Sequence, residues 1–313
     1  MTMRPILLAA GGTGGHMFPA EALARELLAR GRVVALVTDR RGKAFGDALP
    51  EITVHRIRAA SPSGGILGKA RAFVELGLGT LQAQRLISFL RPAAVVGFGG
   101  YPSVPAVVAA QRGGVATVLH EQNAVLGRAN RLLAGSARAI CTAFPEVEGV
   151  RPADADKLVL TGNPVRPALA ALRVAPYPEP ADGRLSVLVT GGSQGARVFS
   201  EVLPAALERL DADRRARLRL SQQARPEDID QVRAAYGRLG IEADLQSFFR
   251  DMPERMAACH LMVCRAGAST VAELTAAGRP AILVPYPHAT DDHQTANARA
   301  VAAAGAAWLV PQP

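Results

Sequence analysis

One local pattern recurs along the chain and constrains its fold more than any other feature: an apolar run, a glycine-rich loop, then an alanine-rich segment. The first copy places the loop 11–16 after the apolar run 5–10, and the second places the loop 191–195 after the run 185–190. Continuous apolar strands that alternate with helices are typical of parallel sheets covered on both faces. Because the two loops begin 180 residues apart, the sequence predicts two similar α/β domains.

Each predicted domain is a doubly wound, Rossmann-like unit, and we expect the carboxyl ends of the two sheets to face a central cleft. The segment 161–167, followed by the proline-rich residues 175–180, predicts the connection, so the domains are expected at 1–163 and 164–313. The expected helices include 19–29 and 197–210. Further strands are expected at 33–38, 93–96, 116–119, 157–161, 260–264 and 281–284.

The charge balance limits the classes of partner. The net charge is +9, and 33 of the 36 cationic residues are arginine, which favours phosphate groups, nucleic acid or an anionic membrane. Aromatic residues make up only 4% of the chain, so the stacking platform of a nucleic-acid binder is missing and no nucleic-acid partner is expected. The uncharged stretch 92–111 contains six prolines and glycines, which predict a strand, a loop and a helix rather than a membrane span.

The glycine loops are candidate phosphate sites, because backbone N–H groups at a helix N-terminus can approach an anion closely. A third candidate is the loop 97–100. The dinucleotide fingerprint G-x-G-x-x-G does not fit, since Met17 occupies its last glycine position. Asp39 follows the second expected strand, where that fingerprint has an acidic residue, so an NAD(P) enzyme remains a minority interpretation. His16 ends the first loop where a helix begins, and a bulky side chain there suggests a function.

The richest polar cluster follows the expected strand 260–264. Ser269 and Thr270 are expected to cap the next helix, and Glu273 stands at capping-box spacing from Thr270. Glu273 therefore has two interpretations: it caps its own helix, or it accepts hydrogen bonds from a ribose diol. A second polar cluster, 285–294, is expected at the neighbouring strand end.

No metal site is predicted. The Asp-x-Asp segments 154–156, 211–213 and 228–230 match a pattern of metal-using sugar transferases, but none follows a buried strand, so all three are expected on the solvated surface. Cys259 and Cys264 lack further thiol partners for zinc and are expected in the core.

Several motifs together resemble one enzyme family. They are the runs 11–16 with Phe18-Pro19, His120-Glu-Gln-Asn123, Gly162-Asn-Pro-Val-Arg166, Gly191-Gly-Ser-Gln-Gly-Ala-Arg197 and the block 264–273. In this order they closely resemble the bacterial N-acetylglucosaminyltransferases that convert lipid I to lipid II in peptidoglycan synthesis. The resemblance implies a GT-B fold, UDP-N-acetylglucosamine as donor, undecaprenyl-pyrophosphoryl-muramyl-pentapeptide (lipid I) as acceptor, no cofactor, and a peripheral place on the cytoplasmic face of the bacterial plasma membrane.

The same resemblance assigns site residues by motif match. It places donor contacts on Thr13, Gly14, Gly15, Asn123, Arg166, Ser193, Phe249, Ala268, Ser269, Thr270, Val271, Ala272, Glu273 and Gln294. Phe249 is assigned only by its distance from Asp251-Met252. Two departures stand out: the family usually continues for some tens of residues beyond Pro313, which suggests a truncated chain, and it often carries glutamine where this chain has His293.

The implied reaction is an in-line attack of the acceptor's C4 hydroxyl on the anomeric carbon, with inversion. The departing pyrophosphate is expected to be stabilised by loop amides, helix dipoles and Arg166. His16 and Glu121 are the candidate general bases, and His16 is favoured; its alternative role is to bind pyrophosphate or acceptor. A UDP-N-acetylglucosamine 2-epimerase, which shares fold and donor but needs no lipid, is the alternative enzyme.

The segment 52–111 is expected to face an anionic membrane. It carries six basic residues and one acid, Glu75, and from Ile66 to Leu81 its apolar residues surround most of a helix. One interpretation is a fully buried helix flanked by solvated arginines. The other is that Ile66, Leu67 and Phe73 insert shallowly into lipid while the arginines meet anionic head groups.

Overall fold

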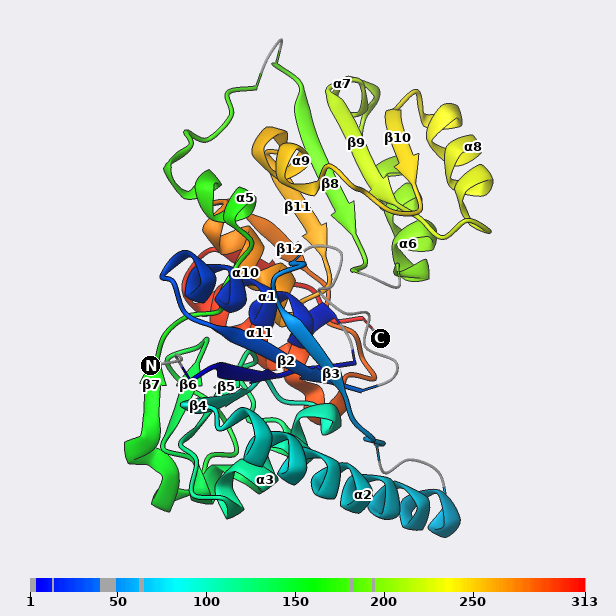
Figure 1. Cartoon of the computed structure of the whole chain (residues 1–313). Coiled ribbons are helices and arrows are strands. Elements are labelled where there is room, and N and C mark those ends of the chain that lie inside the picture. The colour runs from blue at the N-terminus through cyan, green and yellow to red at the C-terminus, as the bar shows by residue number, and fades with distance from the viewer. Residues whose placement is uncertain are drawn as a thin grey trace. The chain divides into compact units, whose positions relative to one another are not determined.

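The computed structural model describes residues 4–12, 14–39, 49–61, 65–180, 183–192 and 195–312. These residues form two compact units, which divide after Arg166, three residues beyond the expected boundary. Each unit is described by itself below, with the labels of Figure 1.

The N-terminal unit is built on a parallel sheet with helices on both faces, as the apolar strands predict. Among the described residues the sheet has seven strands in the order β3-β2-β1-β4-β5-β6-β7. The strands are β1 (Ile6–Ala9), β2 (Val34–Thr38), β3 (Thr53–Arg56), β4 (Ala94–Gly97), β5 (Thr117–Glu121), β6 (Ala139–Thr142) and β7 (Leu158–Leu160). The helices are α1 (Gly14–Ala29), α2 (Ile66–Leu90), α3 (Val104–Arg112) and α4 (Arg128–Leu133), with short 3₁₀ turns at 101–103, 134–136 and 152–157.

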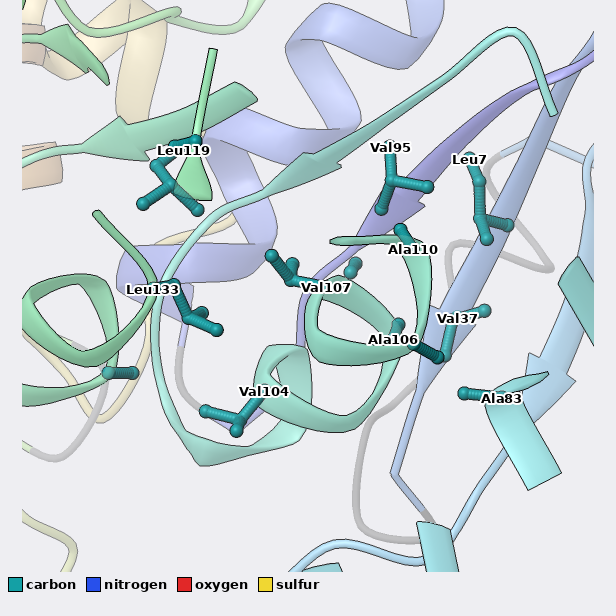
Figure 2. Close-up of a cluster of buried hydrophobic side chains, with 14 of the residues drawn as sticks. Leu7, Val37, Ala83, Val95, Val104, Ala106, Val107, Ala110, Leu119 and Leu133 are labelled. Atoms are coloured by element: carbon teal, nitrogen blue, oxygen red, sulfur yellow. The ribbon is translucent and has the colours of Figure 1, made fainter. Parts of the chain in front are cut away.

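The two faces of this sheet carry separate cores because successive strand residues point to opposite sides. Leu7 and Ala9 of β1 belong to the cluster that includes α3, whereas Leu8 belongs to the cluster that includes α1. Figure 2 shows the first cluster, with Val104 and Val107 of α3 among side chains of β1, β2, β4 and β5. The continuous apolar run of β1 therefore supplies side chains to the cores on both faces of the sheet.

The C-terminal unit repeats the architecture with a six-stranded parallel sheet among its described residues, in the order β10-β9-β8-β11-β12-β13. Its strands are β8 (Leu185–Thr190), β9 (Leu218–Gln223), β10 (Glu242–Gln246), β11 (Leu261–Cys264), β12 (Ala281–Leu283) and β13 (Ala307–Leu309). Its helices are α5 (Pro167–Ala170), α6 (Arg197–Glu208), α7 (Ala212–Ala216), α8 (Ile229–Leu239), α9 (Met252–Ala258), α10 (Ala268–Ala276) and α11 (His293–Ala303), with 3₁₀ turns at 171–174 and 290–292. Phe199 of α6 and Val232 of α8 pack on β8 in a third core.

Two helix starts differ from the sequence prediction. Helix α1 begins at Gly14, five residues before the expected start at Pro19, so the glycines that were assigned to a loop form its first turn. Pro19 lies inside the helix, where it removes one intrahelical hydrogen bond. Helix α10 begins at Ala268 after Gly267, so Ser269 and Thr270 lie within its first turn rather than at its cap.

Helix α2 is mostly exposed, which contradicts the interpretation of a fully buried helix. Of its 25 residues, only Ala72, Gly79, Ala83 and Ile87 are buried. A Cβ added at Gly79 would lie 1.9 Å from the Arg58 carbonyl oxygen, so this glycine permits the close approach of the preceding loop. Figure 1 shows α2 lying beside α3 and continuing past it.

Candidate active site

The polar residues of the N-terminal unit gather at the carboxyl ends of β1, β4 and β5. The strand order reverses between β1 and β4, which is the position at which open α/β sheets bind ligands. Gly12 follows β1 with φ 87°, and Gly99 and Gly100 follow β4 with φ 81° and 68°. These conformations favour glycine, so backbone without side chains lies at the point where the strand order reverses.

His16 lies at this point, in the first turn of α1. Its ring packs on the glycine pair after β4: a Cβ added at Gly100 would lie 3.1 Å from His16 Cδ2 and 3.3 Å from Nε2. His16 Nδ1 lies 3.0 Å from Gln122 Oε1. The ring is thus held by backbone on one side and by a side-chain amide at Nδ1.

Gln122 and His120 continue from His16 into the interior of the unit. Gln122 Nε2 donates to the His120 carbonyl oxygen at 2.8 Å and lies 2.9 Å from His120 Nδ1. His120 Nε2 lies 3.1 Å from the Gly162 carbonyl oxygen. Both side chains are buried, and burial lowers the pKa of His120, which favours the neutral ring.

Glu121 is buried, and its two carboxylate oxygens accept hydrogen bonds from the loop that follows β5 and from helix α4. Oε1 accepts from the backbone N–H and the side-chain amide of Asn123, at 3.0 and 3.1 Å. Oε2 accepts from the Gly127 N–H and from Asn130 Nδ2, both at 2.8 Å. This carboxylate therefore organises the loop 121–130, including Asn123, one of the residues assigned to donor contact.

The other residues of this unit that were expected to contact the donor are Thr13, Gly14, Gly15 and Arg166. Gly14 and Gly15 form the first turn of α1. The guanidinium of Arg166 lies 5.1 Å from the centre of the Phe18 ring, a cation–π distance that holds Arg166 beside α1. Thr13 lies outside the described residues.

In the C-terminal unit, the expected donor residues concentrate on α10, which follows β11 beside the point where that strand order reverses, between β8 and β11. Ser269 Oγ is buried and has no hydrogen-bond partner within the described residues. A buried hydroxyl without a partner costs stability unless a ligand or water satisfies it. The first turn of α10 also presents backbone N–H groups that have no partner within the helix.

Glu273 lies in the second turn of α10. The capping-box interpretation is wrong, because Gly267 precedes the first residue of the helix and Glu273 stands five residues beyond that first residue. Thr270 and Glu273 share one helix face at spacing i, i+3. Val271 is less available: its side chain is buried and its N–H donates to the Gly267 carbonyl oxygen at 2.9 Å.

The side chain of Ala268 is also buried, whereas Ala272 is partly exposed. Gln294, on α11, accepts a hydrogen bond from the Tyr286 N–H through Oε1 at 3.0 Å. The Phe249 side chain is buried beneath Arg255, whose guanidinium lies 4.0 Å from the ring centre. Ser193 lies outside the described residues.

Arg265 braces two loops of the candidate site and was not among the residues predicted from the sequence. Its guanidinium donates to the carbonyl oxygens of Val284 and Pro285 at 3.0 and 2.9 Å, and it lies 5.5 Å from the ring centres of Phe199 and Tyr286. It ties the loop after β11 to the loop after β12. An arginine directly after an apolar strand was the available signal.

Two of the three Asp-x-Asp segments differ from their expected surface position, because Asp154 and Asp228 are buried. Asp154 is buried and paired with Arg151 and Lys157 at 2.7 and 2.8 Å. The hydrogen bond from Lys157 lowers the pKa of Asp154. Within the described ranges, no group of three or more His, Cys, Asp or Glu side chains could hold a metal ion. None of the described helices is long and apolar enough to cross a membrane.

Comparison with known proteins defines the class. Residues 6–142 match the Glycosyltransferase family 28 N-terminal domain, and residues 186–313 match the Glycosyltransferase family 28 C-terminal domain. Together with the two Rossmann-like sheets, these matches define a glycosyltransferase of the GT-B fold.

The most similar relatives define the family within that class. A protein of Rhodospirillum centenum (strain ATCC 51521 / SW), named UDP-N-acetylglucosamine--N-acetylmuramyl-(pentapeptide) pyrophosphoryl-undecaprenol N-acetylglucosamine transferase, is 66% identical over 100% of this chain and 83% of its own length. A protein of the same name from Zymomonas mobilis subsp. mobilis is 50% identical over 99% of this chain and 80% of its own length. The chain belongs to this family of N-acetylglucosamine transferases.

Solved structures agree with that assignment. The crystal structure of Acinetobacter baumannii MurG is similar with a TM-score of 0.78 and 32% sequence identity, over 98% of this chain and 85% of that one. A glycotransferase of kitacinnamycin, at 16% identity and a TM-score of 0.71, shares the fold.

Proposed function

We propose that the chain transfers N-acetylglucosamine from UDP-N-acetylglucosamine to the C4 hydroxyl of the muramyl sugar of lipid I, with inversion, and so forms lipid II. The activity named for relatives up to 66% identical supports the substrates. The observation that carries the chemistry is His16, a ring held at the point where the strand order of the first sheet reverses. No nucleic acid and no cofactor enters the proposed reaction.

His16 serves as the general base in this proposal. When the C4 oxygen bonds to the anomeric carbon, the bond from that carbon to the UDP oxygen breaks and the electron pair leaves with the pyrophosphate. The hydroxyl proton moves to His16, because a neutral imidazole is a suitable acceptor near neutral pH. Glu121 acts as a positioning residue, since its two oxygens already accept four hydrogen bonds.

The donor is held by α10 in this proposal. The N-terminal turn of α10 and the Ser269 hydroxyl stabilise the pyrophosphate, where a helix N-terminus favours negative charge. Glu273 accepts hydrogen bonds from the ribose diol, and Gln294 contacts the donor through the amide group that is not used by Tyr286. Ala268, Thr270, Ala272 and Phe249 contribute through their backbone or their exposed atoms, whereas Val271 positions the helix.

The residues Gly14, Gly15, Asn123 and Arg166 are proposed donor contacts from the N-terminal unit. Arg166 carries the positive charge that the departing pyrophosphate needs. Thr13 and Ser193 keep this role as proposals from their motifs.

Helix α2 is the proposed membrane contact, and in this proposal the enzyme lies peripherally on the cytoplasmic face of the bacterial plasma membrane. Ile66 and Leu67 are each 87% exposed and Phe73 is 67% exposed, which is costly in water for three large apolar side chains on one helix. Lys69 and Arg71 are exposed among them. Apolar side chains interleaved with cations suit the boundary between acyl chains and anionic head groups.

The decisive experiment measures the product. The protein is incubated with radiolabelled UDP-N-acetylglucosamine and a lipid I analogue, and label in the lipid fraction is counted against the His16→Ala variant. Label in lipid supports the transferase. Loss of the donor with label recovered only as the epimerised sugar nucleotide supports the 2-epimerase instead.

A further inference from the structure

The Gln122 side chain fixes the direction of every hydrogen bond in the series that ends at His16. Gln122 Nε2 lies 2.8 Å from the His120 carbonyl oxygen, and a carbonyl oxygen can only accept. The NH₂ group of Gln122 must therefore face His120, which leaves Oε1 facing His16 Nδ1 at 3.0 Å. Since Oε1 can only accept, His16 Nδ1 must carry a hydrogen.

The far end of the series is fixed in the same way. His120 Nε2 lies 3.1 Å from the Gly162 carbonyl oxygen and must donate to it. In a neutral ring His120 Nδ1 then accepts the second N–H of Gln122, at 2.9 Å. Two backbone carbonyl groups, of His120 and Gly162, thus anchor a series with one consistent arrangement of hydrogens.

We propose that Gln122 and His120 are positioning residues that hold His16 in the tautomer with hydrogen on Nδ1, so that the Nε2 lone pair takes the acceptor's hydroxyl proton. This inference rests on the proposed function, which it deepens by assigning the reacting atom. The proton moves from the C4 hydroxyl to Nε2, and the resulting imidazolium keeps its Nδ1–H bond to Gln122 Oε1. The tautomer matters because the other form would present an N–H, which cannot accept a proton.

The surroundings preserve this arrangement. Gln122 is 1% exposed and His120 is 5% exposed, so water does not compete for their hydrogen bonds. Burial lowers the pKa of His120 against the smaller opposing effects of its Gly162 hydrogen bond and the Glu121 charge. The His120 ring also packs 5.6 Å from the ring of Phe98, centre to centre. A neutral His120 keeps the lone pair on Nδ1 that Gln122 needs.

The test reads the tautomer directly in the whole chain. The protein is labelled with ¹⁵N-histidine, and the ring nitrogen shifts of His16, assigned by the loss of its signals in His16→Ala, are recorded at a pH where the ring is neutral. We expect hydrogen on Nδ1 in the wild type and a change toward hydrogen on Nε2, the form that free histidine favours, in Gln122→Met. Hydrogen on Nε2 in the wild type, or no change in Gln122→Met, overturns the proposal.

Gln111→Met is the matched control. Gln111 is in the same unit, and its Nε2 donates to the Leu133 carbonyl oxygen at 2.9 Å, away from His16. The Gln111→Met variant loses a comparable side-chain amide, so we expect its melting temperature to decrease by a similar amount. Its His16 tautomer and its turnover should stay unchanged. A tautomer change in this control as well means that general loosening explains the effect, and it overturns the proposal.

Kinetics supply the second readout. In Gln122→Met we expect kcat to fall about 10- to 100-fold while KM for UDP-N-acetylglucosamine stays within about twofold, since the effect falls on proton transfer. Gln122→Glu keeps an acceptor for Nδ1–H, so it should retain more turnover and move the acidic limb of the pH–rate profile to higher pH. Equal losses in both variants with an unmoved profile contradict a positioning role. A wild type that shows the expected tautomer but no transfer contradicts only the proposed function.

Discussion

The two units share one strand order but differ in what lies where that order reverses. In the N-terminal unit, side chains converge there: His16 from α1, then Gln122 and His120 from the end of β5. In the C-terminal unit, the corresponding position is next to the N-terminal turn of α10, with the Ser269 hydroxyl and Glu273 beside it. The same fold thus presents oriented side chains in one unit and a helix N-terminus in the other.

In the proposed function, this difference assigns one chemical task to each unit. Proton transfer needs a single nitrogen with a lone pair in a fixed place, which only a side chain held by further hydrogen bonds can supply. Binding a pyrophosphate needs several donors and a favourable dipole, which backbone amides supply without side-chain rearrangement. We therefore expect variants in the two units to change different kinetic constants.

The largest effect is expected in the N-terminal unit, for His16→Ala. Removing the proposed general base should lower kcat by about 10²- to 10⁴-fold while donor affinity changes by less than about threefold. Steady-state kinetics and donor titration measure the two quantities, with the exposed histidine variant His288→Ala as control. Turnover near the wild-type value would remove His16 from the reaction.

The next largest effect is expected in the C-terminal unit, for Glu273→Ala. Charge-assisted hydrogen bonds to the ribose contribute about 1.5–3 kcal/mol, so donor affinity should fall about 10- to 150-fold. Isothermal titration with UDP measures it, and the exposed Glu254→Ala on α9 is the control. An unchanged affinity in a folded Glu273→Ala protein would remove the ribose contact from the account.

Vesicle binding tests whether the exposed apolar and cationic side chains of α2, rather than those of the C-terminal unit, contact the membrane. Sedimentation with anionic liposomes at low salt should weaken about tenfold in Arg71→Ser/Phe73→Ser, because an inserted ring and a cation near the surface are lost. Salt should weaken the wild type as well. The matched double variant Arg238→Ser/Phe248→Ser, which removes an exposed cation and an exposed ring from the C-terminal unit, should bind as the wild type does. Equal binding to neutral and anionic vesicles would contradict the proposed contact.

The smallest effect is expected for Gln294→Ala. Oε1 of Gln294 accepts from the Tyr286 N–H, so the variant loses one neutral donor contact and part of the loop's support. A net hydrogen bond contributes about 0.5–1.5 kcal/mol, and donor affinity should fall about threefold with kcat unchanged. A loss as large as that of Glu273→Ala would mean that the loop after β12, rather than α10, dominates donor binding.

The sequence predicted the elements better than the ends of the helices. Apolar runs located eight of the thirteen described strands, because burial on both faces leaves few alternatives. The strands β3, β6, β9, β10 and β13 were not predicted. Helix α1 was predicted to begin at Pro19, since glycine has low helix propensity; in the structure its first turn includes Gly14 and is held by the tertiary contact of His16 with Gln122. Helix α10 likewise begins before its expected serine and threonine caps, after Gly267.

Residues of the candidate site could be proposed from the sequence where they belong to a motif, but not where only a tertiary contact connects them to the site. His16 and Glu273 belong to recognisable motifs, the runs 11–16 and 264–273, and were assigned from the sequence. From the sequence, Glu121 and His16 were alternative candidates for the general base. The four hydrogen bonds that the Glu121 carboxylate accepts in the structure favour a positioning role for Glu121 instead. Gln122 lies next to Glu121 in the chain, yet its link to His16 spans 106 residues, a separation that no local pattern reports.

The most direct measurement of the central claim is a single-turnover experiment run in parallel on the wild type, His16→Ala and Glu273→Ala, with the donor concentration varied at a fixed, saturating concentration of a lipid I analogue. We expect His16→Ala to reach a much lower limiting rate at the same half-saturating donor concentration. Glu273→Ala should approach the wild-type limiting rate at a half-saturating concentration about 10- to 150-fold higher. If both variants changed the same constant, the division of proton transfer and donor binding between the two units would be contradicted.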